Sequence, residues 1–251
     1  MFKKHLNNLK NNNNGMKLGI YIKNFKIYYQ VLEELKRRKI DFVEIFPGDD
    51  DSDLIVLTDS NYSFKNCIYV ENPLHAIRKS LSKLYGKESF NEIFVGIDPG
   101  ERVGLAVFGD GICLEEFELT ELGEIINTIE NIFNDYLPKK FLVRIGMGDE
   151  PNRNRIINLL FGKFKLELVD EYGTTSIKNR NIEAAKKIAL KKGKLIRSKM
   201  EIRPRRGEIS EVQRKSRISS NNLVTISREL AKKVIKGELD LNEAIEIQKK
   251  G

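Results

Sequence analysis

Asp98 is the residue of this sequence best placed for chemistry. It ends the apolar run 93–97, which is typical of a buried strand, and Pro99-Gly100 after it favours a tight turn. A second apolar run, 103–108, leaves that turn. A carboxylate held rigidly at the tip of a central strand can meet a metal ion or a phosphate group.

Acidic side chains end two further strand-like runs. Asp149-Glu150 follows the run 141–145 across a Gly-x-Gly turn, and Asp170-Glu171 follows the run 165–169. If these strands are parallel neighbours of the strand before Asp98, all the carboxylates share one edge of a sheet. Convergent oxygen ligands suit Mg²⁺ or Mn²⁺ and build two-metal phosphoryl-transfer sites. The simpler interpretation is that Asp and Glu favour turns, but three such strand ends point towards a metal site.

The region 91–196 must position these carboxylates. Its pattern predicts three strands joined by short Gly-containing turns, which suit antiparallel hairpins, and then strands that alternate with helices. This order implies an α/β fold with a mixed sheet flanked by helices, whose later strands run parallel to the first. The predicted strands are 93–98, 103–108, 112–118, 141–145 and 165–169, and the predicted helices are 121–136, 152–161 and 181–192.

Three further regions are predicted around this one. Residues 1–15 have no periodic pattern and are expected to form a disordered leader. Residues 16–90 alternate short strands with helices over 25–38 and 73–84, which predicts a small α/β domain. Residues 197–251 are expected to form a basic helical extension with too few apolar residues for a core of its own. Its predicted helix starts are the capping boxes Ser210-x-x-Gln213 and Asp240-x-x-Glu243 and the N-cap Ser227.

Composition narrows the class of protein. The 251 residues are 40% hydrophobic and 32% charged, as in an ordinary globular chain. No apolar run reaches membrane-spanning length and no signal peptide is visible, so no membrane partner and a cytoplasmic location are expected. Two cysteines cannot form a disulfide framework, and two histidines outside any Cys/His cluster argue against structural zinc.

The net charge of +8 is concentrated in one segment. Between Lys178 and Arg217 there are 15 Lys and Arg residues against 4 Glu, so this segment carries +11 and the rest about −3. Such a segment is typical of a surface that contacts nucleic-acid phosphates, although a solvated helix face with a basic linker would have the same charge.

Two motifs of this sequence resemble one group of nucleases. The segment Asp98-Pro99-Gly100-Glu101-Arg102-Val103-Gly104-Leu105-Ala106 is similar to the first-strand motif of the RuvC and YqgF branches of the ribonuclease H-like superfamily. Asp170-Glu171-Tyr172-Gly173-Thr174-Thr175 resembles the Asp-Glu-x-x-Thr-Thr signature of the YqgF branch, and Gly146–Arg153 sits where that branch has a Gly-rich turn. The resemblance covers about residues 91–196. It implies a ribonuclease H-like sheet and cleavage of nucleic-acid phosphodiesters with Mg²⁺ or Mn²⁺.

The resemblance also implies which carboxylates act. Asp98 and Glu171 would be catalytic metal ligands, with Asp170 beside them. The turn after Asp98 is one residue shorter than the family pattern, and Tyr172 replaces a frequent arginine. In RuvC-type proteins the final helix supplies further aspartates, but here Asn181 and Ala184 fall at those positions. Glu183 either completes the catalytic and metal-binding set by a shift in register or is a helix-start glutamate favoured by the helix dipole.

Basic residues near these carboxylates are expected to contact the nucleic-acid backbone, since phosphate contacts position a substrate without specifying its sequence. They are Arg102, Lys178, Arg180, Arg203, Arg205 and Arg206.

The leading hypothesis is a metal-dependent nuclease of the RuvC/YqgF-like class that hydrolyses phosphodiesters in structured nucleic acid, DNA or RNA. The alternative is a nucleic-acid-binding protein on a catalytically degenerate ribonuclease H-like fold. An actin-like ATPase or sugar kinase ranks last, because residues 16–90 contain no second Gly-rich phosphate loop. Junction-cleaving members of the group are often dimers, so a homodimer is a further expectation.

Overall fold

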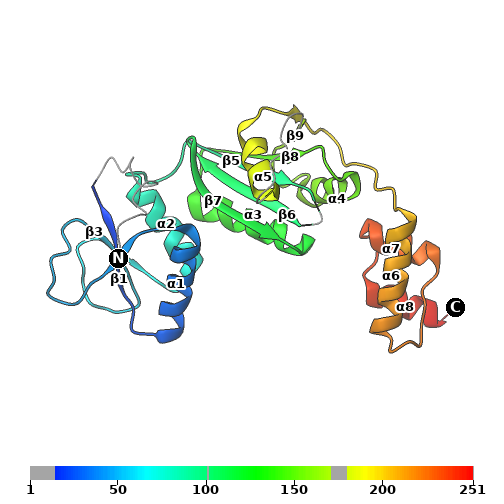
Figure 1. Cartoon of the computed structure of the whole chain (residues 1–251), viewed down its shortest axis with the longest axis horizontal. Helices are drawn as coiled ribbons and strands as arrows, with labels where there is room; N and C mark the ends of the chain where they lie inside the picture. The colour runs from blue at the N-terminus through cyan, green and yellow to red at the C-terminus, as the bar shows by residue number, and fades with distance from the viewer. Residues whose placement is uncertain (1–14, 101, 171–179, 251) are drawn as a thin grey trace.

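A computed structural model describes residues 15–100, 102–170 and 180–250, with only the backbone of Arg180. The predicted leader, residues 1–15, lies outside this part except for Gly15. Three units follow one another along the longest axis of the molecule (Figure 1). They are a small α/β unit, a central α/β unit with a larger sheet, and three C-terminal helices.

The N-terminal unit contains a parallel sheet of four strands in the order β2-β1-β3-β4. Both of its helices pack against one face, where Val31, Leu35 and Ile77 lie fully buried against strand residues such as Leu18 and Ile55. The elements are β1 (Lys17–Tyr21), α1 (Phe25–Arg38), β2 (Phe42–Glu44), β3 (Leu54–Thr58), β4 (Cys67–Tyr69) and α2 (Pro73–Leu84).

The central unit has a mixed sheet of six strands in the order β10-β9-β8-β5-β6-β7. Strands β5, β6 and β7 form the predicted antiparallel meander, and β8 and β9 run parallel to β5. The elements are β5 (Glu92–Asp98), β6 (Val103–Gly109), β7 (Ile112–Leu119), α3 (Leu122–Tyr136), β8 (Lys140–Gly146), α4 (Glu150–Leu160), β9 (Leu166–Val169), α5 (Arg180–Leu190) and β10 (Lys194–Leu195). The prediction of a mixed sheet flanked by helices is confirmed.

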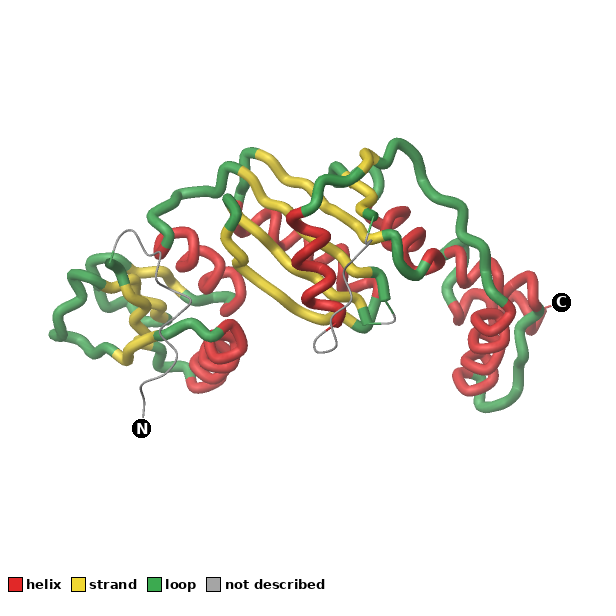
Figure 2. The backbone as a smooth tube through the Cα atoms, turned by 45° about the horizontal axis from the view of Figure 1, so that its top comes forward, coloured by secondary structure: helices red, strands yellow, loops and turns green. Residues whose placement is uncertain are grey.

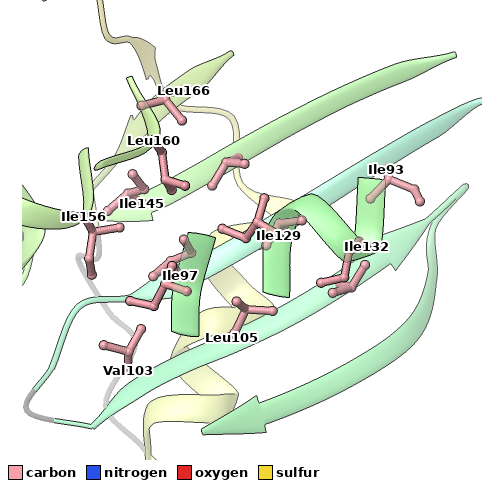
Figure 3. Packing of buried hydrophobic residues seen from close by; sticks show 14 of the residues in the cluster. Ile93, Ile97, Val103, Leu105, Ile129, Ile132, Ile145, Ile156, Leu160 and Leu166 are labelled. Carbon is pink, nitrogen blue, oxygen red and sulfur yellow. The ribbon is translucent and has the colours of Figure 1, made fainter. Parts of the chain in front are cut away.

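Alternation along the strands sends side chains to two different covers. Ile93 and Ile97 of β5 and Leu105 of β6 face α3 and α4, where they join Ile129 and Ile156 in the main core (Figure 3). Gly96, Gly104 and Ala106, on the opposite face of the same strands, face α5, which lies across the other side of the sheet (Figure 2). The two faces of the central sheet are therefore covered differently: large aliphatic side chains cover the face towards α3 and α4, and the backbone of α5 packs closely on the other face.

Close packing of α5 depends on two glycines. A Cβ at Gly96 would collide with the carbonyl oxygen of Ala185 and with Ala189, and a Cβ at Gly104 would collide with the carbonyl of Asn181. Because any larger residue at either position would push the helix off the sheet, these two glycines set the height of α5 above β5 and β6.

The C-terminal helices have a hydrophobic cluster of their own, contrary to the expectation of too few apolar residues. Ile209, Ile226, Ala231, Ile235, Ala244 and Ile245 are buried together. Their helices are α6 (Arg206–Ser219), α7 (Arg228–Lys236) and α8 (Leu241–Lys250). Small residues at helix crossings let a few isoleucines fill this core, which a count of apolar residues does not reveal.

Two of the three predicted helix starts are confirmed. The Ser227 hydroxyl accepts from the Leu230 amide, and Asp240 and Glu243 accept from each other's amides as a capping box does. The start at Ser210 is wrong, since α6 begins at Arg206 and the Glu208 carboxylate accepts from the Arg205 amide. Within the described ranges no helix is long and apolar enough to cross a membrane.

Candidate functional site

The carboxyl ends of β5, β8 and β9 meet at one edge of the central sheet. Ile97 pairs with Ile145, and Gly146 pairs with Val169, so the three strands end side by side. Asp98, the turn 146–149 and Asp170 therefore leave the same edge, as the sequence predicted. We call this part of the molecule the carboxyl edge.

Asn152 joins two of these strand ends, although the sequence analysis did not single it out. Its Nδ2 donates to Asp149 Oδ2 at 3.0 Å and to the Gly100 carbonyl at 3.4 Å. Asn152 lies in the first turn of α4, whose N-cap residue is Asp149. One amide thus bridges the turn after β5 and the turn after β8, and fixes the mouth of the carboxyl edge. The sequence signal that could have identified Asn152 is its position directly after Asp149-Glu150-Pro151, in the first turn of the predicted helix.

The start of α5 lies beside the turn that follows Asp98. The carbonyl of Asn181 abuts Gly104, and a Cβ at Gly100 would lie 3.9 Å from Asn181 Oδ1. The side chain of Asn181 also has its Nδ2 3.5 Å from Glu118 Oε1. The residue of α5 that comes closest to this turn is therefore an amide and not a carboxylate.

Glu183 contacts a lysine over β7. Its Oε1 lies 2.9 Å from Lys186 Nζ, which also pairs with Glu116. Burial lowers the pKa of Lys186, but the hydrogen bonds that its ammonium donates to Glu116 and Glu183 outweigh this effect and raise the pKa well above the usual lysine range. Lys186 therefore stays charged and holds Glu183 towards β7, so a metal-binding role for Glu183 requires this ion pair to open.

Lys191 lies next to Asp170 at the other side of the carboxyl edge. Lys191 Nζ donates to the Asp170 carbonyl at 2.6 Å. The remaining predicted residues of this part, Glu171 and Lys178, lie outside the described residues, as do Tyr172 to Thr175, and no side chain is described for Arg180. Across the described ranges no group of three or more His, Cys, Asp or Glu side chains is placed to hold a metal ion.

Arg203 and Arg205 lie on the segment that connects the central sheet to α6, and Arg206 is the first residue of α6. Arg203 pairs with Glu201 at 2.7 Å, and Arg205 directly precedes α6. Arg102, the other predicted phosphate contact, is exposed in the turn after β5 and lies 4.0 Å from Glu118. Arg102 is thus close to Asp98 in the sequence, whereas the other three arginines come more than 40 residues after the end of α4.

Two asparagines of α4 bind the connecting segment 196–205, which we call the strap. Asn158 exchanges two hydrogen bonds with the backbone of Met200, at 2.7 and 2.8 Å, and Asn154 Nδ2 donates to the Glu201 carbonyl at 2.8 Å. A cavity of about 300 Å³ remains between the strap and the start of α4. It is lined by Glu150, Pro151, Asn154, Arg203, Pro204 and Arg205.

Arg155 ties the C-terminal helices to the same helix. Its guanidinium donates to the Ile235 carbonyl at 3.2 Å, to Glu208 Oε1 at 2.7 Å and to Asn152 Oδ1 at 3.0 Å. Burial raises the pKa of Glu208, but the Arg205 amide and Arg155 more than offset it and lower the pKa. Asn152 and Arg155 therefore form a continuous hydrogen-bonded path from the turn after Asp98 to the C-terminal helices.

The comparisons with known proteins concern the C-terminal helices. Residues 205–250 match the family described as a three-helical bundle domain, in agreement with the buried cluster formed by α6, α7 and α8. A search of curated proteins finds no match to the chain. We refer to α6–α8 below as the C-terminal bundle.

Proposed function

We propose that the protein is a metal-dependent nuclease of the RuvC/YqgF-like class, acting on structured nucleic acid through the carboxyl edge. The observation that carries this proposal is the convergence of Asp98, the turn 146–149 and Asp170 on adjacent parallel strand ends. The strand order, an antiparallel meander followed by two parallel strands, agrees with the ribonuclease H-like sheet that the two motifs imply.

Mg²⁺ or Mn²⁺ fits the oxygen donors of this edge, because both are hard cations that prefer carboxylates and carbonyls. Asp98, Asp170 and Glu171 are the residues that would hold it. When bound, the cation supplies a nucleophilic water and neutralises charge that develops on the leaving oxygen. Asn152 keeps the two flanking turns in register, and Arg102 and the arginines of the strap would hold backbone phosphates on either side.

The test is cleavage of junction, flap, RNA and RNA–DNA hybrid substrates with Mg²⁺ or Mn²⁺. The substitution Asp98→Asn is expected to lower the cleavage rate at least about 100-fold, since a lost metal ligand removes several kcal/mol of transition-state stabilisation. Glu92→Gln is the matched control, because Glu92 begins the same strand at the opposite edge and its carboxylate pairs with exposed Lys140. Cleavage by Asp98→Asn at the rate of Glu92→Gln contradicts the proposal.

One observation favours the alternative of a binding protein that no longer cuts. Asn181 takes the place on α5 nearest to the turn after Asp98, and Glu183 is engaged with Lys186. This alternative predicts no cleavage of any substrate, together with binding whose affinity falls steeply with salt. Substitution of Arg203 and Arg205 by Gln would then reduce the salt dependence while Asp98→Asn leaves binding intact.

A further inference from the structure

In the N-terminal unit, exposed aromatic rings lie where the parallel strands of the smaller sheet end. Phe25 and Tyr29 lie on consecutive turns at the start of α1 and are 75% and 55% exposed. Their ring centroids are 5.8 Å apart and the rings are tilted by 45°. Phe25 therefore leaves most of its apolar area open to water beside a second exposed ring, an arrangement that favours a contact surface.

A second set of rings lies on the neighbouring strand ends. Tyr62, 42% exposed, packs edge-on against Phe64 with centroids 4.8 Å apart, and Phe64 packs in turn against Tyr21 at 5.6 Å. Tyr21 ends β1, and Tyr62 and Phe64 follow β3. The buried Phe64 anchors the two tyrosines, so their rings are held in place before any partner arrives.

Asp59 brings the two sets of rings together. Its carboxylate, one residue past β3, accepts from the amides of Lys23 and Asn24 at 2.8 and 2.7 Å. Asn24 is the N-cap of α1 and directly precedes Phe25. The loop that carries Tyr62 is therefore fastened to the helix end that carries Phe25. We call Tyr21, Phe25, Tyr29 and Tyr62 the aromatic edge.

Lysines are interleaved with these rings. Lys23 Nζ lies 5.6 Å from the centroid of Tyr21, and Lys26 is exposed between Phe25 and Tyr29 along the helix. Three carboxylates lie at the same strand ends: Asp59 accepts from the two amides, Glu44 accepts from the hydroxyl of Tyr28, and Glu71 is exposed two residues past β4. The Asp59 carboxylate already accepts hydrogen bonds from the two amides that precede α1. A phosphate at these strand ends would therefore bind the lysine ammonium groups and not those amides.

We propose that the aromatic edge binds the unpaired bases of single-stranded nucleic acid, independently of any cleavage at the central sheet. Every base has a π-face that can stack on Phe or Tyr, and lysines beside the rings can follow the phosphates of the same strand. The position fits as well, since a parallel sheet binds ligands outside the carboxyl ends of its strands, here between β1 and β3, from which the chain leaves in opposite directions.

The protein contains no tryptophan, so Phe25→Trp introduces a single fluorescent reporter on the aromatic edge. Titration of the full-length variant with oligo(dT) and oligo(U), in EDTA, is expected to quench this fluorescence as bases stack on the indole. Leu223→Trp is the matched control, because Leu223 is 83% exposed on the C-terminal bundle, and its fluorescence is expected to stay constant. The two oligonucleotides distinguish DNA from RNA, and a blunt duplex of equal length should quench neither variant.

Affinity gives the second measurement. The double substitution Phe25→Ala with Tyr29→Ala is expected to weaken binding of the single strand at least about 10-fold, because each stacked base contributes roughly 1–3 kcal/mol. Equal affinity in the double variant and in Leu223→Ala overturns the proposal, as does equal quenching of the two tryptophan reporters. Quenching by a mononucleotide at the same concentration of bases would also overturn it, since that result indicates a nucleotide pocket. Nuclease activity plays no part in these outcomes, so failure of the proposed cleavage leaves them unchanged.

Discussion

The two joints between the units of this molecule are built differently. At the first, Glu115 of β7 is buried between Arg38 of α1 and Arg78 of α2, with ion pairs of 2.9 and 2.8 Å. At the second, Asn154 and Asn158 of α4 hold main-chain atoms of the strap, and Arg155 holds Glu208 and the Ile235 carbonyl of the C-terminal bundle. The first joint places charge where water cannot reach, so it depends on every partner being present. The second is a set of partly exposed hydrogen bonds that can be lost one at a time.

Removing the buried carboxylate should have the largest effect on either joint. Glu115→Gln removes the counter-charge that two buried arginines share and leaves Arg38 with Glu34 alone and Arg78 with Asp135 alone, so we expect a loss of about 3 kcal/mol in the free energy of unfolding, measured in urea. Glu116→Gln is the control on the next residue, where the carboxylate is about half exposed and pairs with Lys186. That variant should unfold within about 0.5 kcal/mol of the wild type. Equal effects at 115 and 116 would show that the first joint is no stronger than a surface pair.

At the second joint, Arg155→Met should release the C-terminal bundle without unfolding the sheet. Loss of the charge-assisted bonds to Glu208 and the Ile235 carbonyl should cost about 2 kcal/mol, which corresponds to a roughly 30-fold larger population of the detached bundle. Limited trypsin digestion between 197 and 206 should accelerate by a similar factor, because cleavage follows the open population. Arg214→Met removes an exposed arginine that pairs only with Glu211 among the described contacts, and should leave the digestion rate unchanged.

A smaller effect is expected where the strap meets α4. Asn158→Ala removes both bonds to Met200 and should weaken the strap by about 1–2 kcal/mol, or roughly 10-fold in the same digestion. Asn158→Asp keeps the acceptor for the Met200 amide but sets a carboxylate oxygen against the Met200 carbonyl, so it should be digested at least as fast as the alanine variant. An alanine variant that is digested no faster than the wild type would mean that Arg155 alone holds the bundle.

Acid should weaken the first joint. Burial raises the pKa of Glu115, but Arg38, Arg78 and the Tyr136 hydroxyl together lower it below the usual glutamate value. The stability from this carboxylate is complete at neutral pH, declines as the unfolded chain takes up the proton near pH 4.5, and is lost when pH falls through the lowered folded pKa. At pH 4 the loss should be at most about 0.8 kcal/mol, and it should be missing in Glu115→Gln.

Local patterns in the sequence predicted most of the secondary structure. The Pro-Gly turn after Asp98, the short Gly-containing turns and the strand–helix alternation correctly indicated a mixed sheet with Asp98 and Asp170 at one edge. The start of α6 was missed because Ser210-x-x-Gln213 also fits a capping box, whereas the pair that forms one turn earlier is Arg205 and Glu208. Arginine is not a usual N-cap residue, so the start at Arg205 has no strong signal in the sequence, whereas Ser210-x-x-Gln213 has one.

Contacts between distant residues could not be predicted from one sequence. Glu115 resembles any outward-facing glutamate of an alternating strand, and its arginines lie 37 and 77 residues away along the chain. Arg155 and the asparagines of α4 likewise carry no local sign that they hold residues 200, 201 and 235. Whether Glu171 joins Asp98 at the carboxyl edge is a prediction that lies outside the described residues.

The two glycines under α5 have a consequence for engineering the chain. Because Gly104 lets the main chain of Asn181 rest directly on β6, the location of position 181 depends on backbone contact and hardly at all on which side chain it carries. Asparagine and aspartate have nearly the same shape, so exchanging one for the other here changes the charge while the backbone stays in place, although the new carboxylate would face Glu118 at the position of the Asn181 amide. The substitution Asn181→Asp, which exchanges one nitrogen atom for oxygen, would therefore test whether a negative charge at position 181 is all that the proposed cleavage still requires.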